Sequence, residues 1–202
     1  MSKESNELPH ARQPERAQTV FQRLDRAERA PYAVRERLLR ALWTVLNRTV
    51  WRVPRAWGWR RTLLRLFGAK VGRGTIFRAS ATVVHPWLFE IGEYSAVGLG
   101  VTIYNLGPIK IGSHTTISQE TYVCAGTHDY TQPHLPLVRP PITIGSGVWI
   151  AAQAFIGPGA TIGDNCVIGA RAVVSGDVPA GMIAAGNPAK AIKPRPMNGP
   201  GN

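Results

Sequence analysis

The amino-acid sequence predicts an all-β solenoid, in which short parallel strands stack coil upon coil. After residue 70 an aliphatic residue recurs at intervals of six, it is usually followed by glycine, and the fourth residue after it is usually small. The aliphatic–glycine pairs are Val71-Gly72, Ile91-Gly92, Val97-Gly98, Ile111-Gly112, Ile144-Gly145, Ile156-Gly157, Ile162-Gly163 and Ile168-Gly169. Self-similarity at a short fixed period is typical of repeat architectures.

A helix does not fit this period. Glycine costs about 1 kcal/mol in a helix interior, and an apolar stripe with a period of six would rotate away from any one helix face. Three hexads instead close one triangular coil, in which the aliphatic residues fill the interior and glycine accepts the backbone of the corner. The spacing is uninterrupted from Ile144 to Val174. We therefore expect a parallel β-helix over residues 69–180.

The repeat is interrupted at three places. It slips by two residues around His85–Trp87 and again around Asn105–Pro108. The largest interruption follows Val123 and contains an extended loop, residues 128–141, which is rich in proline. Because long loops on a rigid scaffold commonly carry function, we expect the functional groups there.

Two regions precede the repeat. Residues 1–30 are polar and charged, which predicts a flexible basic tail. Residues 31–68 predict an amphipathic helical segment, since Pro31 suits a first helical turn, apolar residues recur near helical spacing up to Trp51, and Pro54 should end the helix. Two roles remain open for this segment: it packs on the end or flank of the β-helix, or its residues 31–67 dock on an anionic membrane.

The positive charge lies almost entirely in the first part of the chain. Residues 1–80 hold 18 Lys and Arg against 6 Asp and Glu, whereas residues 81–202 hold 6 of each, for a net charge of +12. This distribution predicts that the positive charge attracts the protein to an anionic surface and takes no part in the chemistry. We expect no nucleic-acid partner, because no recognition module accompanies the charge.

The start of the chain and its cysteine content predict a cytoplasmic protein. The first residues are polar and do not form the apolar run of a secretory signal. The two cysteines, Cys124 and Cys166, should be reduced thiols. No apolar stretch reaches the roughly 18 to 20 residues that cross a bilayer. If the helical segment docks, the protein is peripheral on the inner face of the cytoplasmic membrane.

Several motifs resemble those of the hexapeptide-repeat acetyltransferases, especially the sugar O-acetyltransferases and the colanic acid acetyltransferase subgroup. The resemblance covers about residues 60–195 and includes THDY at 127–130, the proline-rich loop, the repeat run at 142–179 and AAGNPAKAIK at 184–193. It implies a left-handed β-helix, a homotrimer with sites between neighbouring subunits, acetyl-CoA as co-substrate and no metal. The hand follows from the resemblance, because periodicity alone does not show it.

The resemblance makes His128, which opens the extended loop, the general base. Imidazole suits this role, because an alcohol must lose a proton of high pKa as its oxygen attacks a thioester. Glu120, Asp129 or a backbone carbonyl would orient the ring. The resemblance also places Trp149 beside the base, although packing at a coil corner is an alternative for it, and we expect burial in both cases.

The resemblance further assigns the remaining contacts. The backbone amide near Ala152 stabilises the oxyanion. The pantetheine arm runs along Ala152 and Ala170, residues 181–202 form a CoA-binding tail, and the nucleotide lies near Ser175, Pro188, Lys190 and Lys193. Where many relatives have Thr-Lys-Asp this chain has Ser175-Gly176-Asp177, so a cation is missing at Gly176, for which Lys190, Lys193 or Arg171 could compensate.

Tyr104 and Asn105 lie in the region that contacts the acceptor in the family, with a simple turn residue as the alternative for Asn105. Together these features predict an acetyl-CoA-dependent O-acetyltransferase acting on a sugar hydroxyl in exopolysaccharide or other surface polysaccharide biosynthesis. The acceptor would be a saccharide or a lipid-linked saccharide.

Three other functions compete with this prediction. N-acetylation of an amino sugar is the first alternative, and a noncatalytic β-helix scaffold is the second. A zinc carbonic anhydrase of the same fold is disfavoured, because His114, His128 and His134 do not match the spacing of its ligands.

Overall fold

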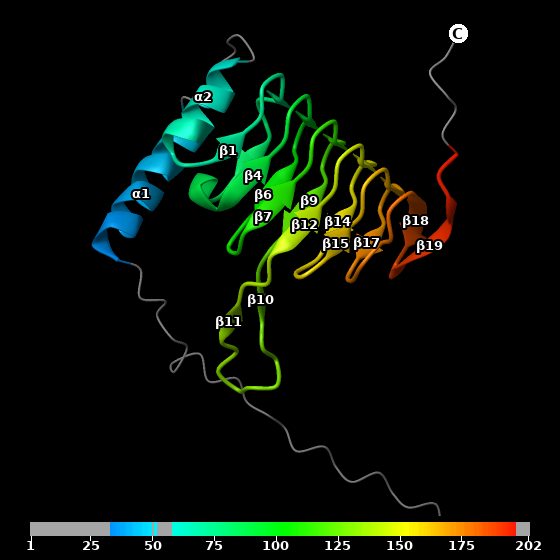
Figure 1. Ribbon diagram of the computed structural model, residues 1–202. Coiled ribbons are helices and arrows are strands. Elements are labelled where there is room, and N and C mark those ends of the chain that lie inside the picture. Colours follow the sequence, from blue (N-terminus) through cyan, green and yellow to red (C-terminus); the bar gives the residue numbers. More distant parts are fainter. Residues whose placement is uncertain (1–32, 50, 52–57, 197–202) are drawn as a thin grey trace, which may run out of the picture.

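The computed structural model of the chain describes residues 33–49, 51 and 58–196. Figure 1 shows a stack of coils that is covered at one end by two helices and ends at the other in a hairpin. The predicted tail at residues 1–30 lies outside the described residues. Each coil contributes one strand to each of three parallel sheets, so the predicted left-handed parallel β-helix is confirmed.

Sheet A contains the first strand of each coil: β1 (Lys70–Val71), β4 (Phe89–Ile91), β7 (Ile109–Ile111), β12 (Ile142–Ile144) and β15 (Thr161–Ile162). Sheet B contains β2 (Ile76–Phe77), β5 (Ala96–Val97), β8 (Thr116–Ile117), β13 (Trp149–Ile150), β16 (Val167–Ile168), β18 (Met182–Gly186) and β19 (Ala189–Pro194). Sheet C contains β3 (Thr82–Val83), β6 (Thr102–Tyr104), β9 (Tyr122–Cys124), β14 (Phe155–Ile156) and β17 (Val173–Val174). We call the edge where sheet B leads into sheet C the B–C corner, and the edge where sheet C leads into sheet A the C–A corner.

The aliphatic residues of the hexads stack in register through the interior. In sheet A, Ile91 pairs with Ile111, Ile111 with Ile144, and Ile144 with Ile162. All four side chains are buried, and so are the small residues at the fourth position, such as Cys166. The predicted interior is therefore confirmed.

The glycine that follows each aliphatic residue serves a different purpose from the one expected. These glycines do not have a positive φ, so they are not needed for a left-handed backbone. They are needed for space: a Cβ on Gly112 would lie 2.5 Å from the backbone nitrogen of Ser146 in the next coil. Close contact between coils therefore explains the repeat.

Two helices cover the open end of the first coil: α1 (Val34–Arg48) and α2 (Gly58–Leu66) (Figure 1). The indole N–H of Trp43 donates to the carbonyl of Val83 (2.7 Å), and that of Trp51 donates to the carbonyl of Ala81 (2.8 Å). Both rings are buried. The segment thus packs on the end of the β-helix and covers groups of the edge strand β3. Among the described residues no helix is both long and apolar enough to span a membrane.

All three interruptions of the repeat lie at the C–A corner. The first contains the short 3-10 helix η3 (Pro86–Leu88), and the third forms the hairpin of β10 (Thr127–His128) and β11 (Leu137–Val138). The excursions are hydrogen-bonded to one another: the N–H of Gly107 donates to Ala125, and the N–H of Ile142 donates to Pro108. Within the described part of the β-helix, the C–A corner therefore carries all three interruptions of the repeat.

Candidate active site

His128 lies at the base of the hairpin that extends from the C–A corner. It ends β10, pairs with Leu137 of β11, and has an exposed side chain. Its ring Nδ1 is 2.6 Å from the carbonyl oxygen of Leu135. Because a carbonyl oxygen can only accept, Nδ1 carries the hydrogen, and in the neutral ring Nε2 keeps its lone pair. The hairpin thus presents the tautomer that a general base requires.

The backbone carbonyl is the orienting group among the three that the sequence left open. The carboxylate of Asp129 accepts from Thr131 (2.6 Å) and Gln132 (2.7 Å), and these bonds hold the pKa of Asp129 below its usual range. The carboxylate of Glu120 accepts from Gln153 at the B–C corner (2.6 Å).

Ala152 and Ala170 lie in successive coils at the B–C corner. The N–H of Arg171 donates to the carbonyl of Ala152 (2.9 Å), which joins the two turns. A ladder of side chains runs along the same corner, since Arg171 Nε donates to Gln153 Oε1 (2.8 Å) and Gln153 in turn donates to Glu120. Ala152 is half-buried and Ala170 is exposed beside this ladder.

Trp149 starts β13 in sheet B and does not meet the expectation of burial, because 49% of it is exposed in the single chain. Its indole N–H donates to Ser118 Oγ (3.1 Å). Ser118 and Gln119 also line a hollow of about 530 Å³, and Gln119 accepts from the N–H of Gln153, next to Ala152. Trp149 therefore belongs with the B–C corner, whereas His128 belongs with the C–A corner.

The predicted CoA-binding tail forms a hairpin in the part that is described. β18 continues sheet B beside β16, and β19 returns antiparallel to it. Pro188 lies in the turn of this hairpin, close to the coil of Ala170, and Lys190 and Lys193 are exposed on β19. Ser175 instead follows β17 at the C–A corner. Residues 197–202 lie outside the described part.

The two predicted acceptor residues differ in accessibility. Tyr104 is half-buried on sheet C, where its ring packs against Tyr122 at 5.9 Å. Asn105 is fully buried. Its Oδ1 accepts from the backbone N–H of His85 (2.9 Å) and its Nδ2 donates to the carbonyl of His85 (2.5 Å). This geometry favours a structural role for Asn105 over contact with the acceptor. The role goes beyond that of the simple turn residue named as the alternative, because the side chain joins the first two excursions.

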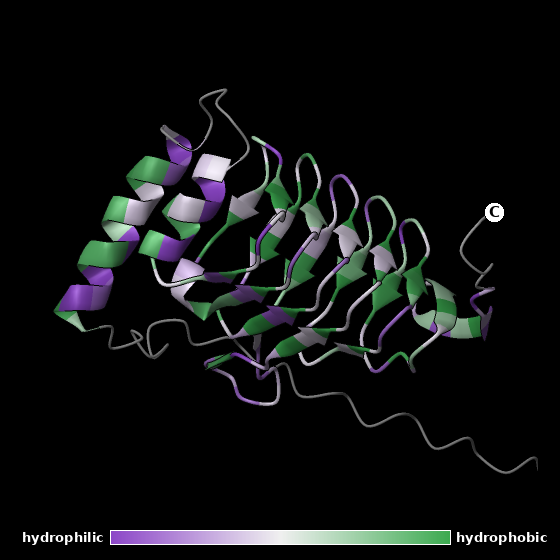
Figure 2. Ribbon diagram, turned by 45° about the horizontal axis from the view of Figure 1, so that its top comes forward, coloured by the Kyte–Doolittle hydropathy of each residue, from purple (hydrophilic) through white to green (hydrophobic). Residues whose placement is uncertain are grey.

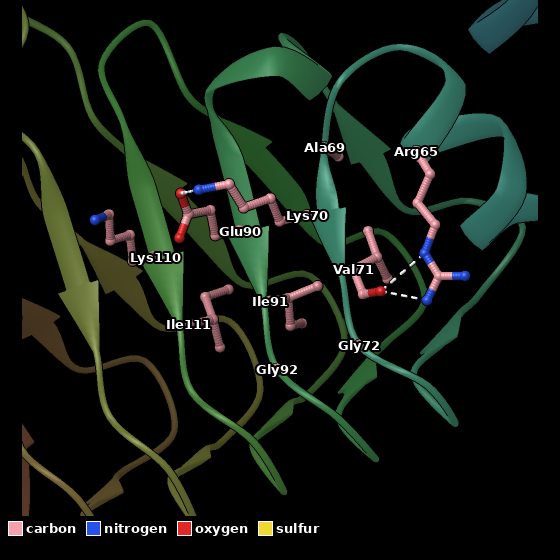
Figure 3. Close-up of a pocket in the computed structure, with 10 residues that line it drawn as sticks. All are labelled: Arg65, Ala69, Lys70, Val71, Gly72, Glu90, Ile91, Gly92, Lys110 and Ile111. Carbon is pink, nitrogen blue, oxygen red and sulfur yellow. Dashed lines mark hydrogen bonds and ion pairs between the residues drawn. The ribbon is translucent and has the colours of Figure 1, made fainter.

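Figure 3 shows a separate hollow of about 540 Å³ beside α2 and the first strands of sheet A. Lys70 Nζ lies 2.8 Å from Glu90 Oε1, and this ion pair holds the pKa of Glu90 below its usual range. The Arg65 guanidinium is hydrogen-bonded to the carbonyl of Val71. The lining includes none of the residues predicted for the active site.

Comparison with known proteins identifies the family of the chain. Residues 141–176 match the family model of the bacterial transferase hexapeptide, which describes six repeats. The chain is 42% identical over 156 residues to WcaF of Escherichia coli K12, a protein assigned to colanic acid biosynthesis as an acetyltransferase, and the match covers 76% of this chain and 86% of that protein. The chain belongs to the hexapeptide-repeat acetyltransferases.

Two solved structures of this kind superpose on the chain. A hexapeptide-repeat acetyltransferase of Vibrio cholerae in complex with acetyl-CoA has a TM-score of 0.75 at 23% identity, covering 82% of this chain and 91% of its own. A galactoside acetyltransferase in complex with coenzyme A has a TM-score of 0.71 at 26% identity, covering 79% and 82%. As a hexapeptide-repeat acetyltransferase, the protein is an acyltransferase with acetyl-CoA as co-substrate.

The histidines named for the zinc alternative have separate surroundings. The ring of His114 stacks on Tyr94 (5.4 Å), whereas His128 is bonded to Leu135 within the hairpin. Within residues 33–49, 51 and 58–196, no three His, Cys, Asp or Glu side chains gather as metal ligands would.

Proposed function

We propose that the protein transfers an acetyl group from acetyl-CoA to a sugar hydroxyl during biosynthesis of an exopolysaccharide or another surface polysaccharide. The observation that carries this proposal is the Nδ1 bond of His128 to Leu135, which leaves Nε2 available as a base on the scaffold of an acetyltransferase. The names of relatives support the substrate class, since they include WcaF and a galactoside O-acetyltransferase of Escherichia coli, which is 26% identical over 180 residues.

The residues act in a direct transfer. His128 Nε2 takes the hydroxyl proton as the oxygen attacks the thioester carbon, and the amide of Ala152 donates to the oxyanion. The amides on either side are already used, because Ala151 donates to Ile168 and Gln153 donates to Gln119. When the tetrahedral intermediate collapses, the bond to sulfur breaks and His128 returns the proton to the thiolate. No acyl-enzyme forms.

The site is completed between copies in a homotrimer. Within one chain, His128 and Ser175 share the C–A corner, whereas Ala152, Ala170 and Pro188 lie at or near the B–C corner. Sheet C separates the two corners. A cyclic assembly would bring the C–A corner of one copy against the B–C corner of the next. Base and oxyanion donor would then face the same hydroxyl.

The protein acts in the cytoplasm, with a peripheral position on the inner face of the cytoplasmic membrane. The helical segment at residues 31–67 supports this position, because it joins apolar and basic side chains. A lipid-linked saccharide is then the natural acceptor, and a soluble saccharide would be taken by the same chemistry.

The test is acceptor-dependent release of free thiol from acetyl-CoA, with a panel of saccharides and amino sugars. His128→Ala should lose about 10²- to 10⁴-fold in turnover, the usual contribution of a general base. His134→Ala is the matched control, because it removes another imidazole from the same hairpin and should keep turnover. Release with amino sugars alone would show N-acetylation. No release with any acceptor, together with no binding of CoA, would show a scaffold.

A further inference from the structure

Helix α1 has two faces in different surroundings. On the inner face Trp43 is only 2% exposed and is bonded to strand β3. On the outer face Val34, Leu38, Leu42 and Val45 are 71%, 66%, 53% and 59% exposed. Figure 2 shows the apolar residues along this helix at the end of the stack. Packing on the β-helix therefore accounts for one face of α1 and leaves the other without an explanation.

The four exposed residues form one stripe, which we call the outer stripe. They are spaced by three or four positions, so at about 100° per residue they share one side of the helix. Arg35 projects at one edge of this stripe and Arg48 at the other, and both are exposed. An apolar strip with cations along both edges is the pattern of a helix that lies in a lipid interface, where Arg pairs with headgroups.

We propose that the outer stripe docks α1 on the surface of an anionic lipid bilayer. This deepens the proposed function by naming the face of α1 that contacts the membrane, and it rests on the proposed function only for the reason why docking is useful. The excess of positive charge in residues 1–80 is complementary to anionic lipid. A second copy of the chain fits less well. The stripe is about 16 Å long and about 10 Å wide, whereas a stable dimer buries about 800 Å² on each partner.

The position of α1 relates the membrane to the chemistry. A hollow of about 660 Å³ lies among α1, the end of α2 and η3, and its lining includes Arg35 and Leu39 from α1, and Arg139, which follows β11. The base of the hairpin therefore lies on the side of the docking helix, while β18 and β19 lie at the opposite end of the stack (Figure 1). Docking would hold His128 near the headgroups, where the saccharide of a lipid-linked acceptor lies, and would leave the CoA end facing away.

The test is cosedimentation of the full-length protein with phosphatidylcholine vesicles that contain about one third phosphatidylglycerol. In Leu38→Gln/Leu42→Gln the partition coefficient should fall roughly tenfold or more, since two apolar side chains no longer enter the interface. In Arg35→Gln/Arg48→Gln it should fall about fivefold for each cation. Salt near 1 M should also weaken binding. Ile192→Gln, which changes a 62% exposed apolar residue at the far end of the stack, should bind like the wild type.

Failure of docking can be told apart from failure of the proposed function. Thiol release with a soluble saccharide should be unchanged in Leu38→Gln/Leu42→Gln, because these side chains point away from the β-helix. Vesicle binding that survives this substitution would overturn the proposal and assign binding to another segment, such as residues 1–32. Self-association that this substitution abolishes, without any vesicle binding, would overturn it in favour of a second copy.

Discussion

Replacing Asn105 with alanine is expected to lower the free energy of unfolding by about 2–4 kcal/mol. The change removes two hydrogen bonds to the backbone of His85, each contributing about 1 kcal/mol net, and leaves the backbone N–H of His85 without its partner, whereas the carbonyl still accepts from the N–H of Leu88. For a chain of this length, 1 kcal/mol shifts Tm by about 2–4 °C, so Tm should fall by roughly 4–16 °C. The first two excursions of the C–A corner, which the Asn105 side chain joins, would no longer be held together.

The assay combines thermal unfolding with steady-state kinetics. Tm is followed by circular dichroism at one fixed protein concentration, because the proposed assembly would make Tm depend on concentration. His128→Ala is the control: its exposed side chain should leave Tm nearly unchanged while turnover is lost. If Asn105→Ala instead leaves Tm unchanged and raises KM for the saccharide, Asn105 contacts the acceptor and its structural role is refuted.

Two further predictions concern pH and coenzyme affinity. Burial, assisted by the charge of Arg40, lowers the pKa of His85 from 6.5 to about 4. As the pH falls from 6.5 toward 4, the His85 side chain of the unfolded protein therefore takes up a proton, whereas that of the folded protein does not. The free energy of unfolding should therefore decrease across that window in urea titrations, and His85→Gln should flatten the decrease. Gly176→Lys should lower KM for acetyl-CoA severalfold at constant kcat in the thiol assay, because it supplies the cation that is missing at this position beside the phosphates. The new side chain should fit, since no atom lies within 4 Å of an added Cβ. An unchanged KM would contradict a phosphate near Ser175.

The hexads made the interior predictable because the period fixes which side chain points inward. Ile150, Ile156, Ile162 and Ile168 are at most 1% exposed, as the spacing predicts. The same spacing located the three interruptions along the sequence, and the structure places all of them at the C–A corner. The role of the glycines was not predictable, because contact between coils depends on distances that one sequence does not contain.

The details of the site depended on contacts between distant residues. His128 is oriented by Leu135, seven residues along the chain, and that contact requires the fold of the whole hairpin, including the positive φ of Leu135 (47°). Asn105 looks like an exposed turn residue in the sequence, yet the preceding excursion covers it. Trp149 is exposed because it precedes the inward-facing Ile150 and so faces outward from sheet B. The spacing already indicated this orientation, but the expectation of burial did not use it.

The last prediction concerns which copies of the chain supply the two groups of each active site. The coils fix His128 at one corner and Ala152 at another, so a site between copies needs only one intact group from each neighbour. His128→Ala and Ala152→Pro, which lacks the amide hydrogen, should each be inactive alone. After the two proteins are unfolded, mixed in equal amounts and refolded, about a quarter of the interfaces would combine an intact His128 with an intact Ala152 by random assembly. Thiol release should then recover to about a quarter of the wild-type rate. A mixture that stays inactive, although each variant refolds with the circular dichroism of the wild type, would place both groups of each site in one chain.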